Sequence, residues 1–314
     1  MKINYKNKIC NDHLYLGNKI NSNYFEGWYF KHVNKNKKYS LSFIIGISKS
    51  NKKEVFIQVI ENITNKSYYI KYDIKDFEYS NDPFYIKIKD NYFSLNKIVI
   101  DIDNKITIKG IINYSNLTKI NKNIYSPNIM GPFAYLTNME CNHSVISLRH
   151  KLNGQININD NIINFDNGTG YIEKDYGNSF PKKYIWLQDN TNKNSSIFFS
   201  MAHIPILKFG FTGIISILEV NKKQYRFASY YFSKVNLKKI NDNKYIITVK
   251  QGLKKLIINL DYYKSNKLSS PINGNMNGII KESLNSKCTI SLYKLNKKIF
   301  EDVFTSCAAE VFNY

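Results

Sequence analysis

The stretch YFEGWYFKH, residues 24–32, is followed by YSLSFIIGIS at 39–48 and KEVFIQVIE at 53–61. Each run is short, rich in aromatic and β-branched side chains, and bounded by Asn, Lys or Gly, which is the pattern of a β-strand. Similar runs continue to the end of the chain, for example YIWLQ at 184–188 and KYIITVK at 244–250, and helical periodicity is nearly absent. The sequence therefore predicts an all-β protein.

The number of predicted strands, about twenty, is too large for one small barrel. A chain of 314 residues is long enough for two domains. The loop at 116–136 carries two breakers, Pro127 and Gly131–Pro132, and is the natural boundary. We therefore predict two packed antiparallel β-barrel or sandwich domains with very little helix, at 1–130 and 131–314.

The chain has 45 Lys and Arg against 24 Asp and Glu, a net charge of +21. Such an excess normally indicates a nucleic-acid or acidic-membrane partner. The basic residues are scattered and almost all Lys, with Arg only at Arg149 and Arg226, whereas proteins that read bases rely on Arg. We expect a solvated basic surface and no specific nucleic-acid partner. Binding of a polyanion, or peripheral contact with a membrane surface, stays open as an alternative.

The four cysteines, Cys10, Cys141, Cys288 and Cys307, form no C-x-x-C pair and match no zinc pattern. Because a metal site needs three or four convergent ligands and the five histidines are widely separated, we expect no metal. The N-terminus lacks the apolar region of a signal peptide, and no stretch is long and apolar enough to span a bilayer. These features predict a cytoplasmic protein with reduced thiols.

The segment GTGYIEKDYGNSFP, residues 168–181, concentrates charge in an otherwise repetitive chain. On an extended strand Tyr171, Glu173 and Asp175 share one face and Lys174 lies on the other. Carboxylates at i and i+2 lie within about 7 Å and raise one another's pKa, so one can stay protonated at neutral pH. A protonated carboxyl among aromatic rings suits carbocation chemistry, because ring faces stabilise a cation. A surface strand with lysine ion pairs is the structural alternative.

Five segments together resemble the tocopherol cyclase family, including its bacterial branch. In chain order they are YFEGWYFK, GPFAYL with MECNHSVIS, GTGYIEKDYGNSFP, YIWLQ, and the tail SPINGNMNGIIKES with FEDVF and AAEVF. Tyr176 departs from the family's EKDWG, which has Trp at that place. The resemblance implies two lipocalin-like (calycin-type) domains related to carotenoid 1,2-hydratase, an active site within or between the barrels, and no redox cofactor.

The family reaction implied by the resemblance is closure of a chromanol ring. A prenyl double bond on a hydroquinone is protonated, and the neighbouring phenol oxygen captures the cation. We predict Asp175 as the general acid, Glu173 as the group that raises its pKa, and Lys174 as a residue that orients the loop or a carboxylate. The predicted substrate-binding residues, which would bind phenol hydroxyls or shield the cation, are Glu26, Trp28, Tyr29, Glu140, His143, Tyr176, Trp186 and Gln188.

Two other functions stay open. A lipocalin-like carrier of a lipid or quinone would need an apolar binding site but not the acids. A hydratase of an isoprenoid would capture the cation with water and give a product heavier by one water. In every case the predicted partner is an apolar small molecule, and the sequence does not define the oligomeric state.

Overall fold

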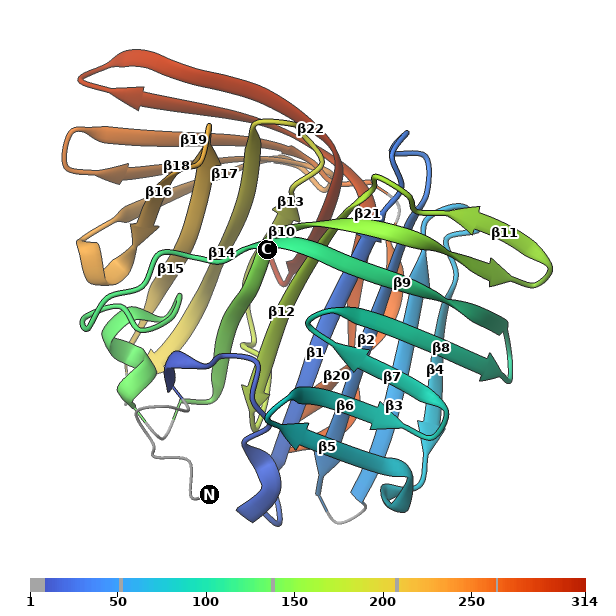
Figure 1. The fold of residues 1–314 in the computed structure, drawn as a ribbon. Coiled ribbons are helices and arrows are strands. Elements are labelled where there is room, and N and C mark those ends of the chain that lie inside the picture. The colour runs from blue at the N-terminus through green and yellow to red at the C-terminus, as the bar shows by residue number, and fades with distance from the viewer. Residues whose placement is uncertain (1–8, 51–52, 137–138, 207–208, 264) are drawn as a thin grey trace. The chain divides into compact units, whose positions relative to one another are not determined.

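The computed structural model describes residues 9–50, 53–136, 139–206, 209–263 and 265–314. Almost every regular element in these ranges is an antiparallel strand (Figure 1). The named helical elements are 3-10 helices of three to five residues, of which η3 (Gly131–Tyr135) has five. No helix within the described ranges has the length and hydropathy needed to cross a membrane. The predicted all-β fold with very little helix is confirmed.

Packing divides the chain into two compact units. Unit 1 contains the described residues up to Phe180 together with Leu268–Ile279, and unit 2 contains Pro181–Lys267 and Ile280–Tyr314. The boundary predicted at 130–131 falls inside unit 1, in the connection between strands β9 and β10.

Unit 1 is built on one curled antiparallel sheet. Its strands pair in the order β4-β3-β2-β1-β12-β10-β9-β8-β7-β6-β5, and β11 pairs with β10. Strand β12 therefore lies between β1 and β10 in the middle of the sheet, although it is the last strand of this sheet along the chain. The strands are β1 (Tyr24–Val33), β2 (Ser40–Lys49), β3 (Lys53–Glu61), β4 (Ser67–Tyr72), β5 (Phe77–Asn81), β6 (Phe84–Ile88), β7 (Asn91–Ser94), β8 (Lys97–Asp103), β9 (Thr107–Thr118), β10 (Cys141–Ile158), β11 (Asn161–Asn164) and β12 (Thr169–Gly177).

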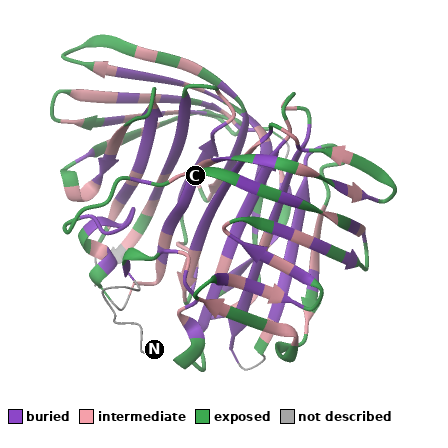
Figure 2. Ribbon diagram, viewed as in Figure 1, coloured by how far each residue is buried: buried purple, intermediate pink, exposed green. Residues whose placement is uncertain are grey.

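The sheet of unit 1 curls until rings from its two arms meet. The centroid of Trp28 on β1 lies 6.1 Å from that of Phe84 on β6, and Phe30 lies 5.4 Å from Phe93 on β7. Phe43 on β2 also contacts Phe93, at 6.2 Å. The hydrophobic core takes buried residues from all four of these strands. Strands β1 and β2 are buried along almost their whole length (Figure 2). Side chains thus fill the inside of unit 1 as a packed core.

Unit 2 is built on a second antiparallel sheet, with a core that includes Phe199, Phe227 and Phe304. Its strands pair in the order β16-β15-β14-β13-β22-β21-β19-β18-β17, and β20 pairs with β21. The tip of the β20–β21 hairpin belongs to unit 1. The strands are β13 (Tyr184–Asp189), β14 (Ser195–Ile206), β15 (Phe209–Val220), β16 (Lys223–Ala228), β17 (Lys234–Asn241), β18 (Lys244–Gln251), β19 (Lys254–Asp261), β20 (Asn266–Ile272), β21 (Asn275–Lys294) and β22 (Lys297–Phe312).

Two neutral histidines lie in the core of unit 1. His32 on β1 and His150 on β10 both pair with Gly170 on β12, and both are buried. The Tyr114 hydroxyl lies 2.5 Å from His32 Nε2, and Ser147 Oγ lies 3.0 Å from His150 Nδ1. Burial lowers the pKa of His32 from 6.5 to about 3, and burial together with the charge of His32 lowers the pKa of His150 well below its usual value.

These histidines predict a loss of stability in acid. Because their folded pKa values are depressed, the unfolded chain binds more protons below about pH 6.5, and each histidine costs about 1.4 kcal/mol per pH unit from there downward. Urea unfolding of wild type and His32→Gln at pH 7, 6, 5 and 4 measures this. As the pH falls, the variant's free energy of unfolding should decrease less steeply than that of wild type. The difference should be about 1.4 kcal/mol per pH unit, because one fewer proton is bound on unfolding. Equal slopes would show that His32 is not neutral in the folded state.

Candidate active site

Strand β12 presents chemically different side chains on its two faces. Ile172 belongs to the core of unit 1, and Lys174 lies on the same inner face. Glu173 and Asp175 alternate with them and lie on the outer face of the sheet. The pairing of β10 with β12 sets His143 directly opposite Asp175. Register alone therefore brings these two acids and one histidine together.

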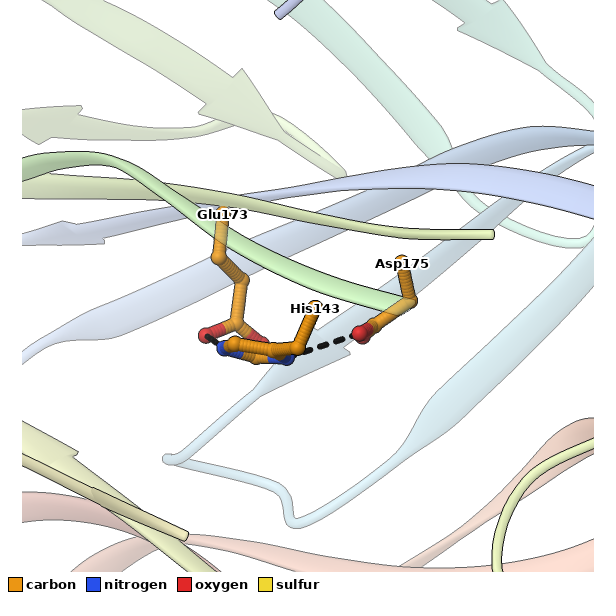
Figure 3. Close-up of side chains that lie close together, drawn as sticks. All are labelled: His143, Glu173 and Asp175. Atoms are coloured by element: carbon orange, nitrogen blue, oxygen red, sulfur yellow. Dashed lines mark hydrogen bonds and ion pairs between the residues drawn. The ribbon is translucent and has the colours of Figure 1, made fainter. Parts of the chain in front are cut away.

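The imidazole ring of His143 lies between the two carboxylates (Figure 3). Its Nδ1 is 2.7 Å from Asp175 Oδ1 and its Nε2 is 3.4 Å from Glu173 Oε2. The Tyr171 hydroxyl donates a hydrogen bond of 2.6 Å to Glu173 Oε2. The Asp175 side chain is 21% exposed against 6% for Glu173, so Asp175 is the more accessible carboxyl. We call His143, Glu173 and Asp175 the acid cluster.

The acid cluster shifts the pKa values of its members. Burial alone would lower the pKa of His143, but the charges of Asp175 and Glu173 and their hydrogen bonds outweigh it and raise that pKa from 6.5 to about 10. Burial raises the pKa of Glu173, and Asp175 raises it further against the opposing effects of His143 and Tyr171. The cluster therefore holds a protonated imidazole at neutral pH and favours a further proton on a carboxyl.

The same three residues have ligand atoms within 4.8 Å of one another, a spacing that can hold a metal ion. From the spacing of the histidines in the sequence we expected no such group of ligands. However, the ring of His143 itself lies between the carboxylates, with one nitrogen directed at each. A metal ligand must be a neutral imidazole, whereas the raised pKa keeps this one protonated. We therefore interpret the acid cluster as a site that stores protons.

Four of the predicted site residues lie on the inner face of the sheet instead. Lys174 Nζ is 2.6 Å from Glu26 Oε1, and both side chains are buried. The same ammonium lies 5.3 Å from the ring centroid of Trp28 and 4.9 Å from that of Tyr176. These residues form one contact group, in which Glu26, Trp28 and Lys174 are buried and Tyr176 is partly buried, on the other side of β12 from the acid cluster.

Glu26 also anchors the segment that precedes β1. Its carboxylate accepts hydrogen bonds from the backbone N–H groups of Leu16 and Gly17, at 2.9–3.1 Å, and from the Tyr24 hydroxyl at 2.7 Å. Lys174 donates to the Leu14 carbonyl. A buried carboxylate with this many donors is satisfied within the protein.

The other predicted residues are placed as follows. Tyr29 lies on the outer face near the acid cluster, where its ring contacts Tyr171 edge-on at 6.4 Å and its hydroxyl accepts from Ser42. Glu140 lies just before β10, and its carbonyl accepts from the N–H groups of Asn178 and Ser179.

Trp186 and Gln188 belong to strand β13 of unit 2. Both are buried, and both point to one face of the strand because they are two residues apart. They pair with Glu310 and Ala308 of β22.

The predicted site omitted Tyr171, which donates to Glu173 and is fully buried. The alternation of β12 already placed it on the face of the two acids. Nothing else in the sequence distinguished Tyr171 from the 24 other tyrosines of the chain.

A curled antiparallel sheet that carries two acids and a histidine close together on its outer face describes a lipocalin-like β protein with a partly buried cluster of titratable groups. The chain belongs to the Tocopherol cyclase-like family, whose model matches residues 87–312. The family resemblance and the lipocalin-like fold predicted from the sequence are thereby confirmed. A comparison with curated protein sequences found no match.

Several solved structures share the fold over most of their length. The crystal structure of CghA with Sch210972 has a TM-score of 0.57 and 8% identity, covering 92% of this chain and 88% of CghA. A putative AttH from Nitrosomonas europaea has a TM-score of 0.56 and 11% identity, with coverages of 91% and 92%. Kievitone hydratase from Nectria haematococca has a TM-score of 0.54 and 9% identity, with coverages of 92% and 89%. At these identities the likeness concerns the fold.

The raised pKa of His143 is directly measurable. A proton NMR titration should show one histidine, lost in His143→Gln, that titrates near pH 10. In Asp175→Asn the same resonance should titrate at a lower pH, because the carboxylate that bonds Nδ1 no longer carries a charge. Asp101→Asn, at an exposed carboxylate paired with Lys109, is the matched control and should leave it in place. A His143 that titrates near 6.5 in the wild type would contradict the proposed charge state.

Proton storage and metal binding make opposite predictions for added cations. Because a protonated imidazole does not ligate a metal, millimolar Mg²⁺ or micromolar Zn²⁺ at pH 7 should leave the His143 resonance unmoved. Dialysis against EDTA should likewise leave its titration near pH 10. Loss or displacement of this resonance on adding either ion, and its return with EDTA, would establish the cluster as a metal site.

Proposed function

We propose that this protein is an acid-catalysed cyclase that acts on an apolar prenylated substrate. Asp175 protonates a carbon of a prenyl double bond, which leaves a tertiary cation on the adjacent carbon. A phenol oxygen of the same molecule bonds to that cation and releases its proton, which returns to the Asp175 carboxylate. Atoms and charge balance within one molecule, so the product is an isomer of the substrate and no redox cofactor is consumed.

The observation that carries this proposal is the contact of 2.7 Å between Asp175 and His143 inside a buried, proton-rich cluster. A protonated His143 stabilises the carboxylate that Asp175 becomes after donating its proton, because the imidazolium lies 2.7 Å from that carboxylate. Glu173 holds the other nitrogen, and Tyr171 orients Glu173.

Membership of a family named after a cyclase supports this reaction class. The choice of Asp175 over Glu173 as donor rests on its greater exposure, since the acid must reach the substrate. We propose that Tyr29, on the outer face of unit 1, belongs to the substrate-binding surface.

Glu26 and Lys174 are given a structural role in this proposal, because their polar atoms are engaged on the inner face of the sheet. Trp28 and Tyr176 pack with Lys174 there. Glu140, which was predicted to bind substrate, contributes through its carbonyl to the turn after β12.

A hydratase is the second candidate, and the fold shared with kievitone hydratase is the observation that favours it. The first step would be the same protonation by Asp175, and a water oxygen would then bond to the cation and lose one proton. The two reactions differ only in the nucleophile, so the mass of the product separates them. A carrier without turnover would bind its ligand on the apolar surface, and the acids would have no catalytic role.

The test is incubation with a prenylated hydroquinone in D₂O, followed by mass spectrometry. A cyclase gives a product with the skeleton of the substrate, a shifted retention time and one non-exchangeable deuterium. A hydratase gives a product heavier by one water. Saturable binding with no product would favour the carrier and overturn the proposal.

Asp175→Asn should lower turnover by roughly 10²–10⁴-fold, the usual contribution of a general acid, in a protein that is still folded at the assay temperature. Glu173→Gln should keep part of the turnover and move the pH profile to lower pH, because the loss of its negative charge lowers the pKa of His143. Asp101→Asn is the control and should behave as wild type. If Glu173→Gln abolished turnover and Asp175→Asn preserved it, Glu173 would replace Asp175 as the donor.

A further inference from the structure

Strand β1 is buried along its whole length except at one position. Nine of its ten residues are buried, and Gly27 alone is of intermediate exposure. Gly27 lies in the middle of the sheet and is paired on one side with Asp175 of β12 and on the other with Gly46 of β2. Residues directly opposite on antiparallel strands point to the same face. The missing side chain of Gly27 is therefore a gap beside Asp175 on the outer face.

The gap is open space that no neighbour fills. A Cβ atom built on Gly27 would meet a single atom within 4 Å, the Ile45 carbonyl oxygen at 3.4 Å, which is an ordinary contact. Gly46 is different, because a Cβ there would lie 2.6 Å from the Glu26 carbonyl and 2.7 Å from the Phe56 ring. Packing thus requires glycine at Gly46, but nothing in the local packing requires it at Gly27.

The backbone gives no reason for glycine at position 27 either. The φ angle of Gly27 is not positive, so its backbone conformation is one that other residues adopt as well. A glycine inside a strand weakens it, because it costs conformational entropy and contributes no side chain. The pairing of β1 with both neighbours has no register shift, so Gly27 does not mark a bulge. A close approach of a ligand or of another backbone is a further reason for such a residue, and we pursue the ligand.

Aromatic rings border the gap on three sides. Phe25 and Tyr29 lie two residues before and after Gly27 on the same face of β1, and both are buried. The ring of Phe56 lies over Gly46, because its Cζ atom would be only 2.7 Å from a Cβ built on Gly46. The fourth side is Asp175. An apolar group lying on the Gly27 backbone would have ring walls around it and the predicted proton donor at its edge.

We propose that Gly27 keeps open the place where the double bond of the substrate lies against Asp175. This inference rests on the proposed function and adds the residue that determines access to it. A flat, narrow group such as a trisubstituted alkene fits a gap of one missing side chain. The aromatic walls would also stabilise the cation formed there.

The experiment compares Gly27→Ala, Gly27→Val and wild type. Both variants should fold with a melting temperature equal to or above that of wild type, because a β-branched or methyl side chain replaces glycine in a strand. Gly27→Val should lower kcat/KM for the prenylated hydroquinone by about 10²-fold, the effect of displacing the reacting group by about 1 Å, and Gly27→Ala by less. Gly46→Ala is the contrast and should lose stability.

Binding separates a failure of this inference from a failure of the proposed function. Addition of the prenylated hydroquinone should shift the His143 resonance in wild type but not in Gly27→Val, whose His143 should still titrate near pH 10. If wild type binds without turnover and Gly27→Val does not bind, the gap is the ligand site of a non-catalytic protein. If Gly27→Val binds and turns over as wild type, the inference is wrong and the assignment of Asp175 stands.

Discussion

A charge buried away from water must be paired, and strand β12 meets this requirement on both of its faces. On the inner face Lys174 pairs with Glu26, and on the outer face His143 pairs with Asp175 and Glu173. Breaking a buried pair costs about 3–5 kcal/mol, because the remaining charge has no partner. Since side chains alternate along a strand, a Lys174 fixed inward also fixes its two acidic neighbours outward. The inner pair thus sets the orientation of the acid cluster.

This arrangement decides where chemistry can occur in unit 1. The resemblance to the family left open an active site within a barrel. In unit 1 the inner face carries packed rings, and its ionised groups are bonded to one another and to the segment before β1. The outer face carries the acid cluster and the gap at Gly27. We therefore place the proposed substrate site on the outer face of this sheet.

Alternation was enough to predict the strands and the division of faces in β12. It placed Glu173 and Asp175 together and Lys174 opposite, as the structure has them. It could not place His143, because that residue is 32 positions from Asp175 and joins it through the insertion of β12 between β1 and β10. The β10–β12 register contains two irregularities, so no count along the sequence gives the pairing. For the same reason nothing in the sequence singled out Gly27, although strand pairing makes it the neighbour of Asp175.

Three histidines show why burial alone does not identify a functional group. His32, His150 and His143 all come from the central strands of unit 1, and burial lowers the pKa of each. The two in the core have hydroxyl partners, which add no charge, and they stay neutral. His143 has two carboxylates, whose attraction for the charged ring exceeds the cost of burial. A protein that needed only a packed core would gain nothing from this third arrangement, since neutral side chains in these places would avoid the desolvation of charged groups. The cost of the acid cluster is therefore the physical argument for a role in proton transfer.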